Sequence, residues 1–182
     1  MSARNCRAFL FMLTTLVLPA AATHLHAADR IGLDQSRDSI IRIVTQIQRA
    51  DYEGDRQALK RLHDELAPIP ADNKLASRVL YWRGFAMWRS AINGFNETPT
   101  PTDLETDLTQ AVTDFNDAIA RDPTWVEPKI GAGSSLGYLM YLNKKDPNRV
   151  QELLQQSSPL LKEGMATAPD NPRLLWVLGP IR

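Results

Sequence analysis

The chain contains few of the residues on which most metal sites and nucleophilic enzymes depend. Among its 182 residues there are one cysteine and three histidines. Zinc and iron sites need clusters of these residues, and nucleophilic catalysis needs a base beside its nucleophile. No such spacing occurs in the sequence, and His63 is expected on the solvent side of a helix. We therefore expect no bound metal, no cofactor and no catalytic residues.

Carboxylates, by contrast, are abundant, with 21 aspartates and glutamates in the chain. Paired carboxylates can act as acid and base, so their number alone leaves that chemistry open. Their positions favour surface roles, because acids suit solvated helix faces and the first turns of helices. The expected solvated face consists of Asp114, Asp117 and Asp122, and the expected first-turn acids are Asp103, Glu105 and Asp107. On this basis we expect the protein not to be an enzyme.

The first residues have the pattern of a secretory signal. Two arginines precede an apolar run from Ala8 to Leu18, and small residues follow it. A membrane-spanning helix needs roughly 20 apolar residues, and this run is shorter. The pattern predicts a signal peptide over residues 1–27, with cleavage after Ala22 or after Ala27. The protein is then periplasmic or secreted, with no stable membrane insertion after cleavage.

The expected mature part, residues 28–182, has no cysteine, so a packed core and not a disulfide framework must hold it together. Its 155 residues suffice for a single domain. Removing the signal leaves 19 basic and 21 acidic residues, which argues against a nucleic-acid surface. Basic residues gather in Lys74–Arg89 and acidic ones in Glu97–Glu127, so we expect these segments to pack together.

Apolar residues recur at helical spacing along the chain, and no stretch shows the alternation of a half-buried strand. We predict an all-α fold of seven helices. They are expected at about 33–49, around 58–66, at about 74–92, from 102 to 121, from about 125, from 146, and from 171. Thr102 and Glu105 predict a capping box, Pro159 predicts a kink or break near Ser157, and the polar segment 93–102 predicts a surface loop.

A structural unit recurs along the chain. Gly84, Gly133 and Gly179 each lie within a helix that follows a proline-containing turn, and the partner helices end at Pro123 and Pro169. The two prolines are 46 residues apart, as are Gly133 and Gly179. A fixed spacing of this kind is typical of repeat architectures, in which each helix pair buries its apolar face against the next.

The residues of the best-defined unit resemble the tetratricopeptide repeat (TPR), a helix-turn-helix unit of roughly 34 residues. The resemblance extends from Leu80 to Pro123 and rests on Leu80, Arg83, Gly84, Ala111, Phe115, Ala118 and Pro123. It implies antiparallel helix-pair repeats forming an α-α superhelix, in about three units with long connections inside each repeat. Ser157, Pro159 and Gly164 depart from the family pattern, so a plain helical bundle stays an alternative.

The resemblance also implies a binding surface, because the first helix of each TPR-like unit lines a concave groove. Carried onto this chain, the groove positions are Arg78, Tyr81, Phe85, Trp88 and Arg89. Aromatic and arginine side chains are favoured at binding hot spots, so the expected partner is a protein or an acidic, extended peptide. In the other interpretation the aromatics are core and the arginines pair with the acidic helix, as Arg83 with Asp114 would.

Three functional hypotheses follow. The first is an exported, non-catalytic TPR-like adaptor for a protein or peptide, with no affinity for nucleic acid. The second is a small-ligand-binding or enzymatic helical domain whose pocket is covered by the 93–102 loop. The third is a fragment of a larger repeat protein, because the expected last helix has no partner to cover Leu174, Leu175, Trp176 and Leu178.

Overall fold

The structure is a computed structural model that describes residues 21–70 and 72–179, with side chains described from Arg37 onward. All regular secondary structure in this part is helical, which confirms the all-α fold class. The helices are α1 (Ala21–Glu53), α2 (Arg56–Glu65), α3 (Asn73–Gly94), α4 (Leu104–Arg121), α5 (Val126–Leu142), α6 (Pro147–Thr167) and α7 (Pro172–Leu178). None of these described helices has the length and apolarity of a transmembrane segment.

The chain divides into two compact units, residues 1–37 and 38–182. Of the predicted signal peptide, residues 1–20 lie outside the described part of the chain, and 21–27 are described only as backbone of α1. That helix begins at Ala21 and not at the predicted position near residue 33. Alanine has the highest helix propensity, so the helix needs no apolar periodicity to extend there.

Several helix starts follow from local capping. The side chains of Asp55, Asp72, Asp146 and Asn171 accept hydrogen bonds from backbone amides in the first turns of α2, α3, α6 and α7. Such caps satisfy amides that have no partner inside the helix. The predicted starts at Asp146 and Asn171 are therefore confirmed. Between α1 and α2 the chain turns at Gly54, whose φ of 73° suits glycine.

Two local predictions were wrong. The capping box at Thr102 does not form, because α4 begins at Leu104 after Asp103, whose carboxylate binds Arg56 and Lys60 instead of the helix amides. Of the kink or break predicted near Ser157, the break does not occur, since α6 continues through Pro159. Pro159 lies on the exposed side of α6, where water can satisfy the carbonyl that loses its amide partner.

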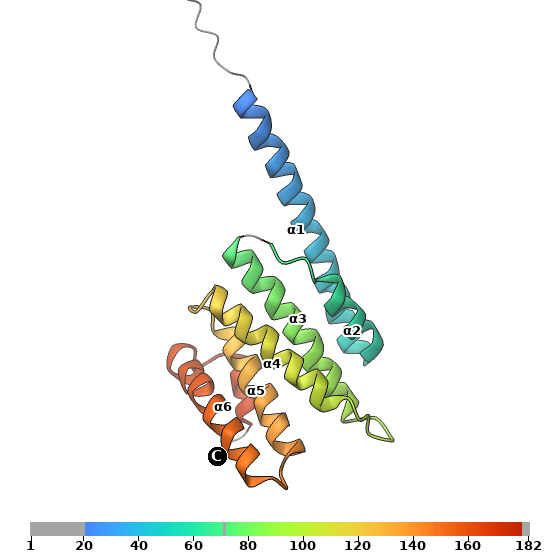
Figure 1. The fold of residues 1–182 in the computed structure, drawn as a ribbon, viewed down its shortest axis with the longest axis vertical. Coiled ribbons are helices and arrows are strands. Elements are labelled where there is room, and N and C mark those ends of the chain that lie inside the picture. Colours follow the sequence, from blue (N-terminus) through green and yellow to red (C-terminus); the bar gives the residue numbers. More distant parts are fainter. Residues whose placement is uncertain (1–20, 71, 180–182) are drawn as a thin grey trace, which may run out of the picture. The chain divides into compact units, whose positions relative to one another are not determined.

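Within residues 38–182 each helix from α2 to α6 packs on its neighbours in the sequence, and Figure 1 shows α3 to α6 lying side by side. Contacts also join α3 to α5, and α7 to both α5 and α6. The core includes the end of α1, through Ile43, Ile47 and Ala50, and large side chains of every helix from α2 to α6. Helices α2 to α6 thus pack one after another in sequence order.

Glycines set the close approaches between these helices. A methyl group on Gly84 of α3 would lie 2.9 Å from Phe115 Cδ1, and one on Gly131 of α5 would lie 2.5 Å from Phe115 Cζ. The ring of Phe115 is therefore held between two glycines of different helices. In the next pair, a methyl group on Gly133 of α5 would lie 2.7 Å from Leu161 on α6. Gly133 thus allows α5 and α6 to approach closely, whereas a methyl group on Gly137 would meet no atom within 4 Å.

A pair of glycine substitutions on α5 tests this packing. Gly131→Ala should destabilise the protein by about 1–3 kcal/mol, because the Phe115 ring cannot retreat from the new methyl group without meeting Gly84. Gly137→Ala should stabilise it by up to about 1 kcal/mol, since the added methyl group meets no atom within 4 Å and alanine favours the helix. Urea denaturation of both variants measures the difference. Equal stability of the two would contradict this account.

Candidate binding cleft

The predicted groove residues of α3 lie mostly in the interior. Tyr81, Phe85 and Trp88 are only 3%, 8% and 2% exposed. The Arg78 guanidinium stacks 3.5 Å from the centre of the Trp125 ring, and Arg89 Nε lies 2.6 Å from an Asp51 oxygen. All five residues lie along α3 and contact other parts of the chain. Phe85, Trp88 and Arg89 nevertheless line a hollow of about 440 Å³, together with Asp51 of α1 and Arg173 and Trp176 of α7.

The ion pairs expected if the arginines of α3 contact the acidic helix α4 are present. Arg83 Nε lies 3.3 Å from Asp114 Oδ1, so a basic residue of α3 pairs with an acidic one of α4 as the charge distribution suggested. Arg78 likewise pairs with Asp122 at 3.2 Å. Phe85 and Trp88 belong to the core, and Trp82 packs partly buried against it. The segregation of charge along the sequence therefore serves contacts between helices.

The short helix α7 covers part of the face that was expected to be open. Arg173 Cζ lies 5.3 Å from the centre of the Phe85 ring, and the rings of Trp88 and Trp176 meet edge to face at 6.0 Å. Glu127 of α5 holds α7 there by accepting hydrogen bonds from Asn171 at 2.6 Å and from Arg173 at 2.9 Å. The last described helix therefore occupies a position in which a partner was expected.

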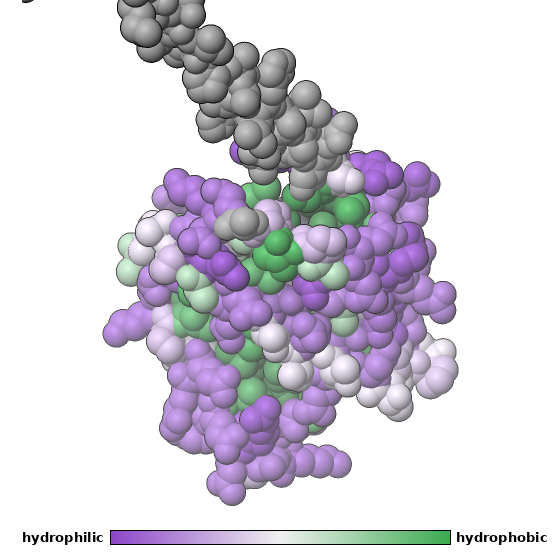
Figure 2. All heavy atoms as spheres, turned by 45° about the horizontal axis from the view of Figure 1, so that its top comes forward, coloured by the Kyte–Doolittle hydropathy of each residue, from purple (hydrophilic) through white to green (hydrophobic). Residues whose placement is uncertain are grey.

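An apolar cleft lies beside α7. Most of the face shown in Figure 2 is hydrophilic, and its hydrophobic atoms gather in separate places between the polar ones. A cleft of about 590 Å³ lies between α5, α6 and α7. Ligand pockets typically have volumes of about 300–1,000 Å³. Its lining consists of Phe95, Gly133, Ser134, Gly137, Tyr138, Met140, Tyr141, Ser157, Leu161, Trp176 and Val177.

Glycines and aromatic rings give the cleft its shape. On α5, Gly137 leaves open space, since a methyl group there would meet nothing within 4 Å. Phe95, in the turn after α3, lies 5.4 Å from the Tyr138 ring and 6.0 Å from the Tyr141 ring. Trp176 of α7 also lines the cleft and is 55% exposed. Phe95 belongs to the 93–102 segment that the sequence suggested as a cover for a pocket, but the lining residues of α5, Gly137, Tyr138 and Tyr141, were not predicted as a site.

The polar groups of the cleft are few and uncharged. Ser157 Oγ donates a hydrogen bond to the Gly133 carbonyl at 3.2 Å, which ties α6 to α5. Ser134 is almost buried in the lining, and no hydrogen bond to its hydroxyl is found among the described residues. The lining contains no Asp, Glu, His, Lys or Arg. This arrangement can bind an uncharged apolar group and supplies no acid–base pair.

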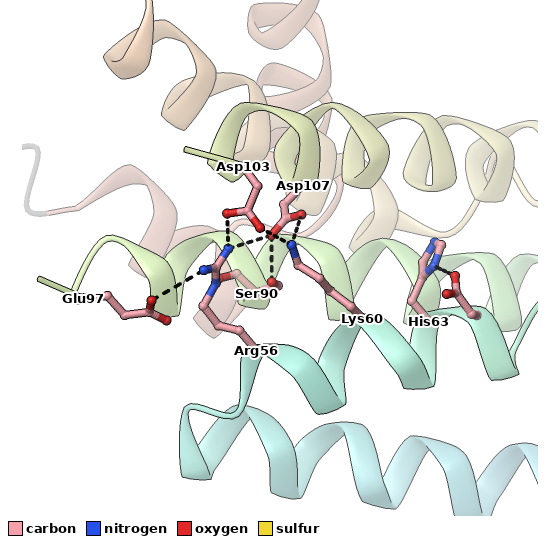
Figure 3. Close-up of polar contacts among 8 residues, drawn as sticks. Arg56, Lys60, His63, Ser90, Glu97, Asp103 and Asp107 are labelled. Atoms are coloured by element: carbon pink, nitrogen blue, oxygen red, sulfur yellow. Dashed lines mark hydrogen bonds and ion pairs between the residues drawn. The ribbon is translucent and has the colours of Figure 1, made fainter. Parts of the chain in front are cut away.

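The main cluster of charged side chains lies elsewhere, where α2 meets α3 and α4 (Figure 3). Arg56 Nη2 is 2.7 Å from Asp103 and 3.1 Å from Asp107, and Lys60 Nζ is 2.5 Å and 2.8 Å from the same two carboxylates. Ser90 of α3 donates to Asp107 at 2.7 Å. Asp107 is buried and fully partnered, so the cluster acts as a link between three helices.

His63 is not in solvent, which corrects the expectation from the sequence. Its side chain is buried, with Nε2 2.9 Å from Asp114 Oδ2 and Nδ1 2.9 Å from Asp64 Oδ1. Asp114 is buried too, contrary to the solvated face expected for it, whereas Asp107 lies in the first turn of α4 as expected and is buried there. The cause is tertiary, because helices α3 and α4 supply the partners, including Arg83, which donates to the His63 carbonyl at 3.1 Å. All these groups have partners, so we assign them to the packing of α2.

The search for metal-binding clusters and the comparisons with known proteins give no further information on the cleft. Among residues 37–70 and 72–179, no group of three or more His, Cys, Asp or Glu side chains could hold a metal ion. Comparison with protein-family models, curated proteins and solved structures found no match. The cleft is consequently characterised by its own geometry alone.

The charged cluster generates a prediction about acid stability. Hydrogen bonds from Lys60 and Arg56 lower the pKa of Asp103 from 3.8 to about 2. A carboxyl whose pKa is lower in the folded state stabilises the protein above its unfolded pKa, and this contribution is lost as pH falls through the folded pKa. Asp103→Asn should therefore lower the unfolding free energy by a constant amount above pH of about 4, and by less as pH approaches 2.

The size of this effect should be about 0.5–1 kcal/mol, because the Asp103 side chain is nearly half exposed and its ion pairs are screened by solvent. Urea titrations of the wild type and Asp103→Asn between these pH values measure it. As a control, Asp103→Asn is also introduced into the Lys60→Gln variant, where it should lower the unfolding free energy by less than it does in the wild type. An effect independent of pH, or unchanged by Lys60→Gln, would contradict the assignment.

Proposed function

We propose that this chain is an exported TPR-like protein that acts as a non-catalytic interaction module for a protein or peptide partner. In this proposal residues 1–27 direct export and are removed, and the remaining chain works in the periplasm or outside the cell. The observation that carries the proposal is the uncharged, aromatic cleft between α5, α6 and α7. Such a cleft suits the binding of a partner's apolar side chains.

The repeat character is supported by the way the helix pairs pack. In the pair α3/α4 a glycine of the first helix contacts a large side chain of the second, Gly84 against Phe115, and α5/α6 repeats this with Gly133 against Leu161. Gly131 of α5 touches the other side of the Phe115 ring, so the second pair stacks on the first. Nearest-neighbour stacking of this kind is what a solenoid of helix pairs uses. In this scheme α7 is the first helix of a further unit.

We place the proposed site on the helix pair that follows α3 and α4. The α3 positions implied by the TPR resemblance contact α7 and α1, whereas the equivalent face of α5 carries Ser134 and Tyr138, which line the cleft. A partner that enters between α5 and α7 would meet Trp176, a residue type favoured at hot spots. The interaction surface proposed here is therefore centred on α5 and α7.

A second candidate is the binding of a small apolar molecule. Phe95, which belongs to the 93–102 segment, lines the cleft, and the volume of about 590 Å³ suits a drug-sized ligand. The cleft has no carboxylates in its lining, so this candidate is a binding protein rather than an enzyme using paired acids. The two candidates share one site and differ in the occupant.

Affinity capture with a blocked cleft tests the proposed module. Gly137→Leu places a side chain in the open space of the cleft, where its first carbon meets no atom within 4 Å. Wild-type protein and Gly137→Leu each serve as immobilised bait for an envelope extract. The wild type should recover the partner, and Gly137→Leu should recover about tenfold less of it or lower still. The partner is identified by mass spectrometry, and thermal unfolding checks that the variant is folded.

The matched control is Thr113→Leu, which adds the same side chain on the exposed face of α4, away from the cleft. It should recover the partner as the wild type does. If all three proteins recover the same set, or if none recovers a protein above an empty matrix, the module proposed here is wrong.

A further inference from the structure

We infer that the cleft receives an uncharged aromatic or long aliphatic side chain of a partner peptide, while an acidic residue of the same peptide meets Lys144 and Lys145 at its rim. This inference rests on the proposed function and specifies the partner's chemistry. It follows from three observations: the lining of the cleft, the charges beside it and a hydroxyl inside it.

The lining restricts what can enter. A charged group placed among the apolar and hydroxyl side chains of the cleft would lose its hydration and find no opposite charge there, which is costly. The inserted part of the ligand is therefore uncharged. Four aromatic side chains contribute to the walls: Phe95, Tyr138, Tyr141 and Trp176. Aromatic rings bind other rings edge to face or offset, so an aromatic side chain gains most at this site.

The rim of the cleft is basic at one end. Lys144 Nζ lies 4.5 Å from the centre of the Tyr141 ring, which itself lines the cleft, and Lys145 follows it in the same exposed turn. Two carboxylates near this turn accept hydrogen bonds from uncharged donors and keep their negative charge. Glu105 accepts from the Asn143 side chain at 3.1 Å, and Asp146 accepts from the amides of Asn148 and Arg149. No ion pair to either lysine is found in the described part of the chain.

The Lys144 ammonium beside an apolar cleft defines a complementary ligand. An acidic side chain next to the inserted residue can approach Lys144 while it stays in solvent, so it gains attraction without the cost of burial, and Lys145 in the same exposed turn adds to the positive charge there. Such rim charges act chiefly on the rate of association and make binding sensitive to salt. A basic peptide would be repelled by the same turn. The charge at this rim therefore distinguishes an acidic partner from a basic one.

The Ser134 hydroxyl provides a polar contact inside the cleft. It lies in the lining, and no hydrogen bond to it is found within the described residues. A hydroxyl can both donate and accept, so it can bind a backbone carbonyl or amide of an inserted segment. A peptide supplies such groups next to each side chain, whereas a purely apolar molecule does not. This favours a peptide over a hydrocarbon-like ligand as the occupant.

Selection from a random dodecapeptide library displayed on phage tests the inference without assuming a sequence. The purified full chain serves as bait, and Gly137→Leu serves for counter-selection, so that only peptides which need the open cleft are kept. We expect the retained peptides to be enriched in Phe, Trp, Tyr or Leu with Asp or Glu close by. Enrichment of basic peptides, of peptides without large apolar residues, or of no peptide at all would overturn the inference.

Calorimetry on one synthetic retained peptide then separates the two contacts. Gly137→Leu should weaken its binding by about tenfold or more, and Thr113→Leu should leave it unchanged. The double variant Lys144→Gln, Lys145→Gln should weaken binding severalfold at low salt, and should have no effect on the same peptide with Asp and Glu replaced by Asn and Gln. An equal effect of the lysine variant on both peptides would overturn the role of the rim.

Two further outcomes keep this inference distinct from the proposed function. Binding of the neutral dye N-phenyl-1-naphthylamine in the cleft, without selection of any peptide, would overturn the inference in favour of a small apolar ligand. Cleft-dependent capture of an envelope protein, together with a failed peptide selection, would leave the interaction module standing and overturn only the stated partner chemistry. If capture does not depend on Gly137 either, both proposals are wrong.

Discussion

The arrangement of the helices depends on one aromatic ring held between two glycines. Phe115 of α4 meets Gly84 of α3 on one side and Gly131 of α5 on the other. Because neither glycine can gain a side chain without displacing the ring, the distances among three helices are set at a single point. The position of α5 in turn determines the cleft, since Gly133, Ser134 and Gly137 follow on the same helix. The site is therefore built on the core and not on a loop.

The buried ion pairs add specificity to this packing. Asp107 and Asp114 of α4 receive Arg56, Lys60, His63 and Arg83 from α2 and α3. Burying such groups has a desolvation cost, so the net stabilisation from each pair is small compared with the cost of losing one partner. Any other register of α2 against α4 would leave carboxylates buried without partners. The charges thus select one arrangement among several that the apolar stripes alone would allow.

What could be predicted from the sequence was mostly local, with the pairing of opposite charges on α3 and α4 as the long-range exception. The helices, the starts of α6 and α7, and the pairing of Arg83 with Asp114 follow from caps, periodicity and opposite charge. What could not be predicted depends on segments far apart in the sequence. The place of α7 on Phe85, the burial of His63 and the space in front of Gly137 are set by tertiary contacts, and no spacing within one helix encodes them. The cleft belongs to this second class.

Helix α7 both covers the aromatic face of α3 and forms a wall of the cleft, and Trp176 takes part in both contacts. One side of its ring meets Trp88 of α3, and the same residue lines the cleft next to α5. The helix that covers the aromatic face of α3 therefore also forms a wall of the apolar cleft. Because Leu174 is fully buried and Glu127 binds both Asn171 and Arg173, α7 is anchored at its start. Trp176, a turn after that anchor and 55% exposed, is the part of α7 that a ligand in the cleft would contact.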